Sequence, residues 1–253
     1  MATADRLLAI LNLFSVQRPD WSVEEAAEAL KAPTSTLYRY INSLTKSGLL
    51  AATGGGRYIL GPAIIRYDRQ LRLTDPLVRA SRGELDRLAR AVAGRGVVFL
   101  CRVFDDQVMC ISQAFVGDVP FTISYERGRL MPLFAGSASR VILANLPAAK
   151  VQVLFRRYPN EFRKANLGAT LPEVRAALKK VKAEGHYVTV GEVDPGMRGI
   201  SVPILLGNKL IGSLSIAGPR QGFSQSQVGQ CLESLLLAAT NISSELHYQV
   251  VQA

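Results

Sequence analysis

The sequence predicts an α+β protein with two domains: an N-terminal winged helix-turn-helix, and a larger domain whose antiparallel sheet is flanked by helices. The chain has 253 residues, which exceeds the usual length of one domain. Residues 1–61 show three helix patterns followed by a glycine-centred hairpin pattern. In the rest of the chain, strand patterns are grouped between helix patterns, and this grouping favours an antiparallel sheet with helices packed on it.

The composition is that of a folded protein. Hydrophobic residues make up 48% of the chain and charged residues 20%. No apolar run approaches the ~18 residues that a membrane span needs, and the N-terminus shows no signal-peptide cleavage pattern. The three cysteines include no C-x-x-C pair and do not indicate a disulfide framework. We therefore expect a cytoplasmic protein.

The net charge of +10 suggests a polyanionic partner, but most of this charge lies outside the N-terminal domain. Residues 1–70 contain eight Lys or Arg against six Asp or Glu, a balance of only +2. The distribution within this segment is more informative. From Lys31 to Arg66 there are five basic residues and no acidic residue, a pattern that favours contact with nucleic acid.

Two helices are predicted before residue 31. Apolar residues at positions 7–14 indicate a first helix that ends before Pro19, because proline disfavours helical geometry in the residue before it. Ser22 stands three residues before Glu25, which is a capping-box signature, and apolar residues follow at helical spacing. A short second helix over about 22–30 is therefore expected.

A third helix is predicted to begin near Thr34, after the interruption at Pro33. Leu37, Ile41 and Leu44 form its apolar stripe. The opposite face carries hydrogen-bond donors and no acid. This helix is therefore amphipathic, with a polar surface suited to an anionic partner.

A hairpin follows the third helix. Gly48 suits the left-handed position after a helix end. The apolar runs 49–51 and 57–60 flank a glycine turn at 54–56. Three helices and a small hairpin, in this order, are typical of a winged helix-turn-helix, in which the third helix enters the major groove of DNA.

The chemistry of the third helix suits this role. Hydroxyl side chains and backbone amides at its start can donate to phosphate. Arg39, one turn later, is suited to a guanine edge or a phosphate, and Arg57 to the DNA backbone or minor groove. The alternative is a small helical domain whose third helix is only a solvated face. The candidate DNA-binding residues are Thr34, Ser35, Thr36, Tyr38, Arg39, Asn42, Lys46 and Arg57.

The remaining chain predicts a connecting helix and a sensor-like α+β module. The arginine-rich segment 63–73 reads as a connector that ends at Pro76. Ser224 and Gln227 cap a long final helix. Between them we expect helices at about 77–92, 137–146, 149–157 and 172–184, and strands at 97–104, 107–115, 121–125, 187–190, 200–206 and 210–217, the last two joined by a turn at 207–208.

Six motifs are spread in order over nearly the whole chain: APTSTLYR at 32–39, GRYILGP at 56–62, GSASR at 136–140, GHY at 185–187, DPGMRGI at 194–200 and LSIAGP at 214–219. Together they resemble the IclR family of bacterial transcription regulators. The resemblance implies a GAF-like effector domain, a linker helix, and homodimers that often pair into tetramers. It divides the chain into a DNA-binding domain at 1–61, a linker helix at 62–75, and a ligand-sensing and oligomerisation domain at 76–253.

The same resemblance implies an effector pocket. Relatives that bind small oxo-acids typically carry an acid at the position of Thr189, Cys at Gly199 and Ser at Ala217, so this pocket is expected to be less polar. We therefore expect a larger carboxylic effector, such as an aromatic acid, with its carboxylate at a helix N-terminus. The alternatives are that Ser137 only caps its helix and that Ser215 is an ordinary strand serine. The candidate effector-binding residues are Ser137, Ala138, Thr189, Gly199, Ser215 and Ala217.

Catalytic motifs are weak in this sequence. Ser43 and Lys46 fit S-x-x-K, but the partner motifs S-D-N and K-T-G are missing. The glycine turn at 54–56 lacks the Lys and Ser/Thr of a P-loop. With only His186 and His247, and with scattered cysteines, a zinc site is improbable. We expect no enzyme activity, no cofactor and no metal.

The sequence therefore predicts a regulator that binds an inverted-repeat operator as a homodimer or tetramer and responds to a small organic acid. Two alternatives stay open. The C-terminal domain serves only for oligomerisation in the first. The second is a small-molecule enzyme with a DNA-binding appendage.

Overall fold

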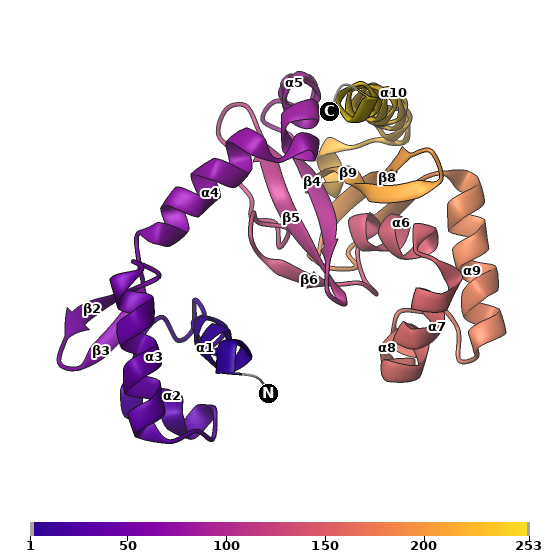
Figure 1. Ribbon diagram of the computed structural model, residues 1–253. Helices are drawn as coiled ribbons and strands as arrows, with labels where there is room; N and C mark the ends of the chain where they lie inside the picture. Colours follow the sequence, from indigo (N-terminus) through magenta and orange to yellow (C-terminus); the bar gives the residue numbers. More distant parts are fainter. Residues whose placement is uncertain (1–2, 252–253) are drawn as a thin grey trace. The chain divides into compact units, whose positions relative to one another are not determined.

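The chain divides into two compact units, Met1–Asp75 and Pro76–Ala253. The computed structural model describes residues 3–251 of them (Figure 1). The first unit contains the predicted three helices and hairpin, which confirms the winged helix-turn-helix. Its elements are α1 (Thr3–Leu11), β1 (Trp21–Ser22), α2 (Val23–Ala29), α3 (Thr34–Lys46), β2 (Leu50–Gly54), β3 (Arg57–Leu60) and α4 (Ala63–Thr74).

Local sequence signals set the helix boundaries of the first unit. The predicted capping box is present, because Glu25 N donates to Ser22 Oγ at 3.2 Å and Ser22 N donates to Glu25 Oε2 at 3.0 Å. Leu37, Ile41 and Leu44 of α3 are buried in the core of this unit, as their spacing predicted. The two-residue strand β1 was not predicted; it pairs with β3, so the wing is a three-stranded sheet of order β1-β3-β2.

The second unit is built on a six-stranded sheet of order β6-β5-β4-β9-β8-β7, in which every neighbouring pair is antiparallel. Helices pack on both faces, and the predicted α+β class is confirmed. The elements are α5 (Pro76–Ala91), β4 (Val97–Phe104), β5 (Gln107–Ala114), β6 (Leu130–Pro132), α6 (Ser137–Asn145), α7 (Ala148–Arg157), α8 (Pro159–Lys164), α9 (Leu171–Glu184), β7 (Tyr187–Val190), β8 (Met197–Leu206), β9 (Lys209–Pro219), the 3₁₀ turn η1 (Arg220–Gly222) and α10 (Gln225–Val251).

Side chains alternate between the two faces of the sheet along its central strands, so this unit has two hydrophobic cores. Helices α5 and α10 cover one face of the sheet, and α6 and α9 lie on the other (Figure 1). Along β4, Val98 and Leu100 belong to the core with α5 and α10, whereas Phe99 and Cys101 belong to the core with α6 and α9. The residues of α6 are buried nearly all round, because this helix lies between the sheet and α9. No helix within residues 3–251 is long and apolar enough to cross a membrane.

One predicted strand is wrong. Residues 121–125 alternate in burial as a strand does, but they are not part of the sheet. A side chain of the protein binds this segment instead of a neighbouring strand. Ser124 donates to the Asp194 carboxylate from its backbone N at 2.8 Å and from its Oγ at 2.5 Å. The edge strand is instead β6, which pairs with β5. The short helix α8 was also not predicted.

Candidate DNA-binding and effector sites

The exposed face of α3 carries a stripe of four polar side chains. Ser35, Arg39, Asn42 and Lys46 stand at i, i+4, i+7 and i+11, so they lie on one side of the helix, and all four are exposed. The stripe lies opposite the buried apolar residues of α3. It offers cationic, amide and hydroxyl donors without an acid.

The start of α3 is also open to an anion. Pro33 occupies the N-cap position and provides no side-chain hydrogen bond to the first amides of the helix. Thr34 and Ser35 are exposed there, and Thr36 is half-buried. Helix N-termini attract phosphate through free amides and the helix dipole.

Two of the predicted DNA-binding residues bind acidic side chains of the protein itself. Tyr38 is 52% exposed, but its hydroxyl donates to Glu24 Oε1 at 2.8 Å. Arg57 Nε contacts Asp20 Oδ2 at 2.6 Å, and Arg57 Nη2 contacts Glu25 Oε2 at 3.2 Å. The hydrogen bond from Arg57 lowers the pKa of Asp20. Arg57 therefore ties the wing to the start of α2, and its charge is balanced by two acids.

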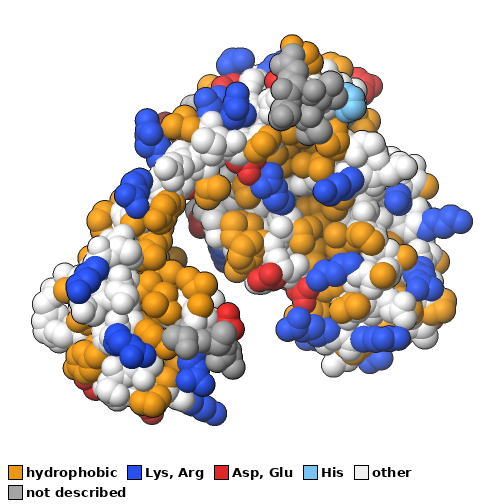
Figure 2. All heavy atoms as spheres, viewed as in Figure 1, with side chains coloured by type: hydrophobic (Ala, Val, Ile, Leu, Met, Phe, Trp, Pro, Cys, Tyr) orange, Lys and Arg blue, Asp and Glu red, His pale blue; other side chains and the backbone are white. Residues whose placement is uncertain are grey.

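The excess charge of the protein lies on the second unit. Residues 76–253 contain 21 Lys or Arg against 13 Asp or Glu, a balance of +8. Figure 2 shows these basic side chains spread over the surface of this unit on the face in view. Bulk charge therefore does not distinguish the first unit, whereas its helix α3 carries an acid-free stripe of hydrogen-bond donors.

Four of the six candidate effector-binding residues line one small cavity. Ser137, Thr189, Gly199 and Ala217 surround it, together with residues of the loop that follows β7. The cavity measures about 30 Å³, which is room for roughly one water molecule. Ala138 and Ser215 do not line it. Both are fully buried.

A cluster of three buried hydroxyls lies beside this cavity. Ser201 Oγ is 2.8 Å from Ser137 Oγ and 2.7 Å from Ser215 Oγ. Ser201 was not among the predicted residues. Gly136 occupies the N-cap position of α6, so the alternative that Ser137 caps this helix is wrong. Gly199 gives the cluster space, since an added Cβ there would lie 2.6 Å from Ser137 Oγ.

An aromatic wall closes the cavity on another side. Tyr125 stacks on Phe99 with ring centroids 5.1 Å apart. Its hydroxyl donates to Ala135 O at 3.1 Å and lies 2.9 Å from Ser139 Oγ. Burial raises the pKa of Tyr125, so its hydroxyl stays protonated in the physiological pH range.

The carboxylate of Glu192 sits at the start of α6. Glu192 Oε2 accepts a hydrogen bond from Gly136 N at 3.1 Å and lies 3.7 Å from Arg140 Nε. Its Oε1 accepts from the Tyr187 hydroxyl at 3.5 Å. Sequence reasoning placed an anion at this helix N-terminus but did not identify Glu192, because the loop carrying it is 56 residues away from Gly136 in the chain.

A second cavity of about 260 Å³ shares Glu192 with the first. Arg140, which lines this cavity, is only 6% exposed. Its Nη2 donates to Ala165 O, whereas its buried Nε has no hydrogen-bond partner in the part of the chain that the structure describes. Phe134 and Tyr187 add aromatic surface to the lining.

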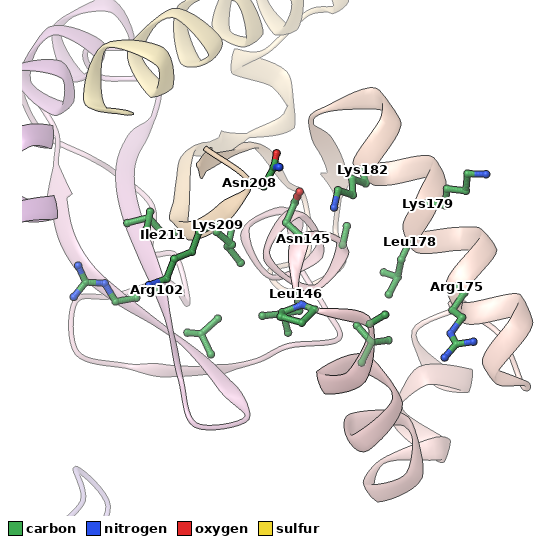
Figure 3. A pocket seen from close by; sticks show the side chains of 17 residues that line it. Arg102, Asn145, Leu146, Arg175, Leu178, Lys179, Lys182, Asn208, Lys209 and Ile211 are labelled. Atoms are coloured by element: carbon green, nitrogen blue, oxygen red, sulfur yellow. The ribbon is translucent and has the colours of Figure 1, made fainter. Parts of the chain in front are cut away.

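A larger cavity of about 810 Å³ lies at the other end of α6 (Figure 3). None of the candidate effector-binding residues lines it. In Figure 3, Leu178 of α9 points into the cavity and Lys179 points away from it. Its lining is apolar, with five basic residues and no acid: Arg102, Arg175, Lys179, Lys182 and Lys209.

The structure brings two of the three cysteines together, although the sequence suggested that they are scattered. Cys101 and Cys110 face each other across the β4–β5 pair, and both are fully buried. Burial raises the pKa of the Cys101 thiol, which disfavours the reactive thiolate. These thiols are part of the core.

Comparison with known proteins gives the family. A model of the C-terminal domain of bacterial transcriptional regulators of the IclR type matches residues 73–244, and a model of the IclR helix-turn-helix domain matches residues 3–54. Among curated proteins, the HTH-type transcriptional regulator KipR of Bacillus subtilis is 24% identical over 260 residues, which cover 97% of each chain. The Pca regulon regulatory protein of Pseudomonas putida is 20% identical and covers 95% of this chain and 82% of that protein.

Solved structures share the fold over the same length. An IclR transcriptional regulator from Alicyclobacillus acidocaldarius superposes with a TM-score of 0.78 at 23% identity, covering 96% of this chain and 98% of that one. An IclR homologue from Microbacterium hydrocarbonoxydans, complexed with 4-hydroxybenzoate, gives a TM-score of 0.76 at 20% identity, covering 98% and 100%. With the two domain models, these likenesses confirm the resemblance seen in the sequence. The chain therefore belongs to the IclR family of bacterial transcriptional regulators, and it is a DNA-binding regulator of that family.

Proposed function

We propose that the α3 stripe of Ser35, Arg39, Asn42 and Lys46 reads the major groove of an operator. What supports this is the exposure of all four side chains on one face and the lack of acids between residues 31 and 66. Thr34, Thr36 and the first amides of α3 then contact phosphate. Tyr38 contributes its ring edge, and Arg57 acts by holding the wing in place.

The regulator acts as a homodimer, or as a pair of dimers, on an inverted repeat. In such a complex two α3 helices engage half-sites about 34 Å apart, which is one turn of DNA. An apolar stripe on α4 supports self-association: Ile64, Tyr67 and Leu71 stand at helical spacing and are 36%, 43% and 60% exposed. In this proposal α4, within residues 62–75, links the two domains and contributes to the dimer.

The C-terminal domain, residues 76–253, binds an organic acid that shifts the regulator between DNA-binding and non-binding arrangements. What supports a carboxylate is the contact that Glu192 already makes at the start of α6. The Microbacterium homologue complexed with 4-hydroxybenzoate makes that aromatic acid the first effector to test. Among the candidate effector-binding residues, Ser137, Thr189, Gly199 and Ala217 surround this site, and Ala138 and Ser215 support it from the core.

The protein acts by binding alone, without turnover, and works in the cytoplasm where its operator lies. The buried thiols support the first point, because a thiol with a raised pKa is a poor nucleophile. An enzyme with a DNA-binding appendage would convert candidate acids, and product analysis after incubation with the purified protein distinguishes the two.

The decisive test is DNA binding by fluorescence anisotropy over a series of salt concentrations. Arg39→Ala should weaken operator binding about 10- to 100-fold, as expected for the loss of a bidentate base contact. Arg156→Ala removes the same charge from an exposed position of the second unit and should leave the affinity unchanged. Equal affinities for wild type and Arg39→Ala would remove Arg39 from the interface, and the absence of salt-sensitive binding would refute the proposal.

A further inference from the structure

We infer that the Glu192 carboxylate occupies the position of the effector carboxylate in the structure, and that an effector acid binds by displacing the Glu192 side chain into solvent. The inference rests on the proposed function, because it assigns the acid-binding site of the same domain. The effector carboxylate then lies between the Gly136 amide and Arg140, and its apolar body extends into the 260 Å³ cavity.

Arg140 supplies the first reason. Its side chain is buried, and its Nε has no hydrogen-bond partner within residues 3–251. Glu192 balances the charge from 3.7 Å, a separation beyond hydrogen-bond length. A buried donor without an acceptor is costly, and a carboxylate free of the chain can approach both the guanidinium and the Gly136 amide. Glu192 therefore balances the charge of Arg140 but leaves the Nε of Arg140 without a hydrogen bond.

The space around Glu192 supplies the second reason. The cavity at the candidate residues, about 30 Å³, is too small for an organic acid, but Glu192 separates it from one of about 260 Å³. A cavity of ~150 Å³ holds a benzene ring. Phe134 and Tyr187 give the larger space aromatic surface on one part of its lining, and Lys164 and Asn166 add polar groups that suit ring substituents such as a hydroxyl. An aromatic acid therefore fits once the Glu192 side chain has left.

The third reason is that Glu192 is able to leave. Its side chain is 29% exposed, so rotation into solvent needs no opening of the core. The loop that carries it begins after Gly191 and ends at Gly196, which have φ of 68° and 74°. Asp194 anchors the same loop to Ser124. Displacement of Glu192 therefore acts on a loop whose far side is bonded to the segment next to Tyr125.

The test uses the full-length protein and two probes, acetate and 4-hydroxybenzoate. Glu192→Ala removes the internal carboxylate and leaves space for an added one. Glu192→Gln keeps the side-chain size and removes the charge. Glu184→Ala, at an exposed glutamate of the same domain, is the matched control. Thermal unfolding is followed in acetate and in chloride at equal ionic strength, and 4-hydroxybenzoate binding is measured by calorimetry. Far-UV circular dichroism and a cooperative thermal transition show that each variant is folded.

Acetate should raise the Tm of Glu192→Ala more than that of wild type or Glu184→Ala. 4-Hydroxybenzoate should bind Glu192→Ala about tenfold more tightly than wild type, because a competing charge-assisted hydrogen bond is gone. For both measurements, the Glu192→Gln result should lie between those of wild type and Glu192→Ala.

Two results would overturn the inference and leave the proposed function intact. One is an equal effect of acetate on all proteins. The other is weaker 4-hydroxybenzoate binding by Glu192→Ala with unchanged binding by Glu184→Ala, which would make Glu192 a ligand contact. If acetate stabilises Glu192→Ala selectively but no aromatic acid binds any of the proteins, the inference stands and the proposed aromatic effector is wrong.

Discussion

Helices α3 and α6 both begin without a side-chain cap, yet their first turns lie in opposite environments. Pro33 precedes α3, whose first residues face solvent. Gly136 precedes α6, whose first residues are buried and whose amide end is filled by Glu192. The same backbone feature therefore lies on an open surface in one unit, where we propose that DNA binds, and in a closed site in the other, where we propose that a small acid binds.

Under these two proposals, the exposure of the first helical turn decides whether a helix N-terminus binds a large polyanion or a small acid. At α3 the partner must approach a convex surface, so side chains on the following turns share in recognition. At α6 the partner must replace a group that the protein supplies itself. Substitutions on α3 should therefore act directly on DNA affinity, whereas those around α6 should act through packing and through competition with Glu192.

The largest effect is expected from an acid placed in the α3 stripe. Asn42→Asp should weaken binding to all DNA sequences by at least about tenfold, because it puts a negative charge against phosphate and removes a donor. Asn208→Asp makes the same chemical change in an exposed turn of the second unit and should have no effect. Anisotropy titrations with operator and with unrelated DNA measure both; similar losses in the two variants would contradict the assignment of the stripe.

Packing around the start of α6 is probed by Gly199→Ala. The added Cβ would lie 2.6 Å from Ser137 Oγ and 3.0 Å from Thr189 Oγ1, so urea unfolding should show a loss of about 1–3 kcal/mol. Gly229→Ala, in helix α10 with open space around it, should instead stabilise by about 1 kcal/mol. Unchanged stability in Gly199→Ala would mean that the hydroxyl cluster rearranges freely.

A smaller effect is expected from Arg57→Ala, because its guanidinium holds the wing. The pKa of Asp20 is lowered chiefly by its bond to Arg57, and the pKa of Glu25 by its bond to the Ser22 amide. Acids with lowered pKa stabilise the folded state above their ordinary pKa, and this contribution is lost as the pH falls through the folded value. Urea unfolding between about pH 7 and about pH 3 should show a weaker acid dependence for Arg57→Ala than for wild type.

DNA affinity distinguishes the two roles of Arg57. A structural role predicts a smaller loss of operator affinity for Arg57→Ala than for Asn42→Asp. A larger loss, with stability unchanged at every pH, would return Arg57 to the DNA-contacting residues.

The smallest effect should come from the large basic cavity at the other end of α6. Lys182→Gln combined with Lys209→Gln removes two of its cations. Calorimetry should give an unchanged affinity for 4-hydroxybenzoate if the acid binds at Arg140. A clear loss of affinity in this double variant would place the effector in the large cavity instead.

The candidate DNA-binding face of α3 was largely predictable because its signals are local. The spacing of Leu37, Ile41 and Leu44 fixes which face of α3 is buried, and therefore which face carries Arg39. The roles of Tyr38 and Arg57 were not predictable, since their partners Glu24 and Asp20 stand 14 and 37 residues away in the chain. Such pairings depend on tertiary structure.

The effector site was predictable only in part. Family motifs placed four residues around one cavity, and the antiparallel sheet was apparent from strand patterns. Ser201, Arg140 and Glu192 were missed because each acts through contacts between distant segments. The segment 121–125 was predicted as a strand from its sequence, in which apolar and polar residues alternate, yet the Ser124 amide donates to the Asp194 side chain. The spacing of apolar residues predicts which side chains are buried, but it does not identify the segment with which a strand pairs.

The most direct test of the proposed regulator function is selection from fragmented genomic DNA of the source organism by purified full-length protein, followed by sequencing of the retained fragments. The account predicts enrichment of an inverted repeat with half-sites about one helical turn apart, and loss of that enrichment in Arg39→Ala but not in Arg156→Ala. Retention of no common sequence, or equal enrichment by Arg39→Ala, would contradict it.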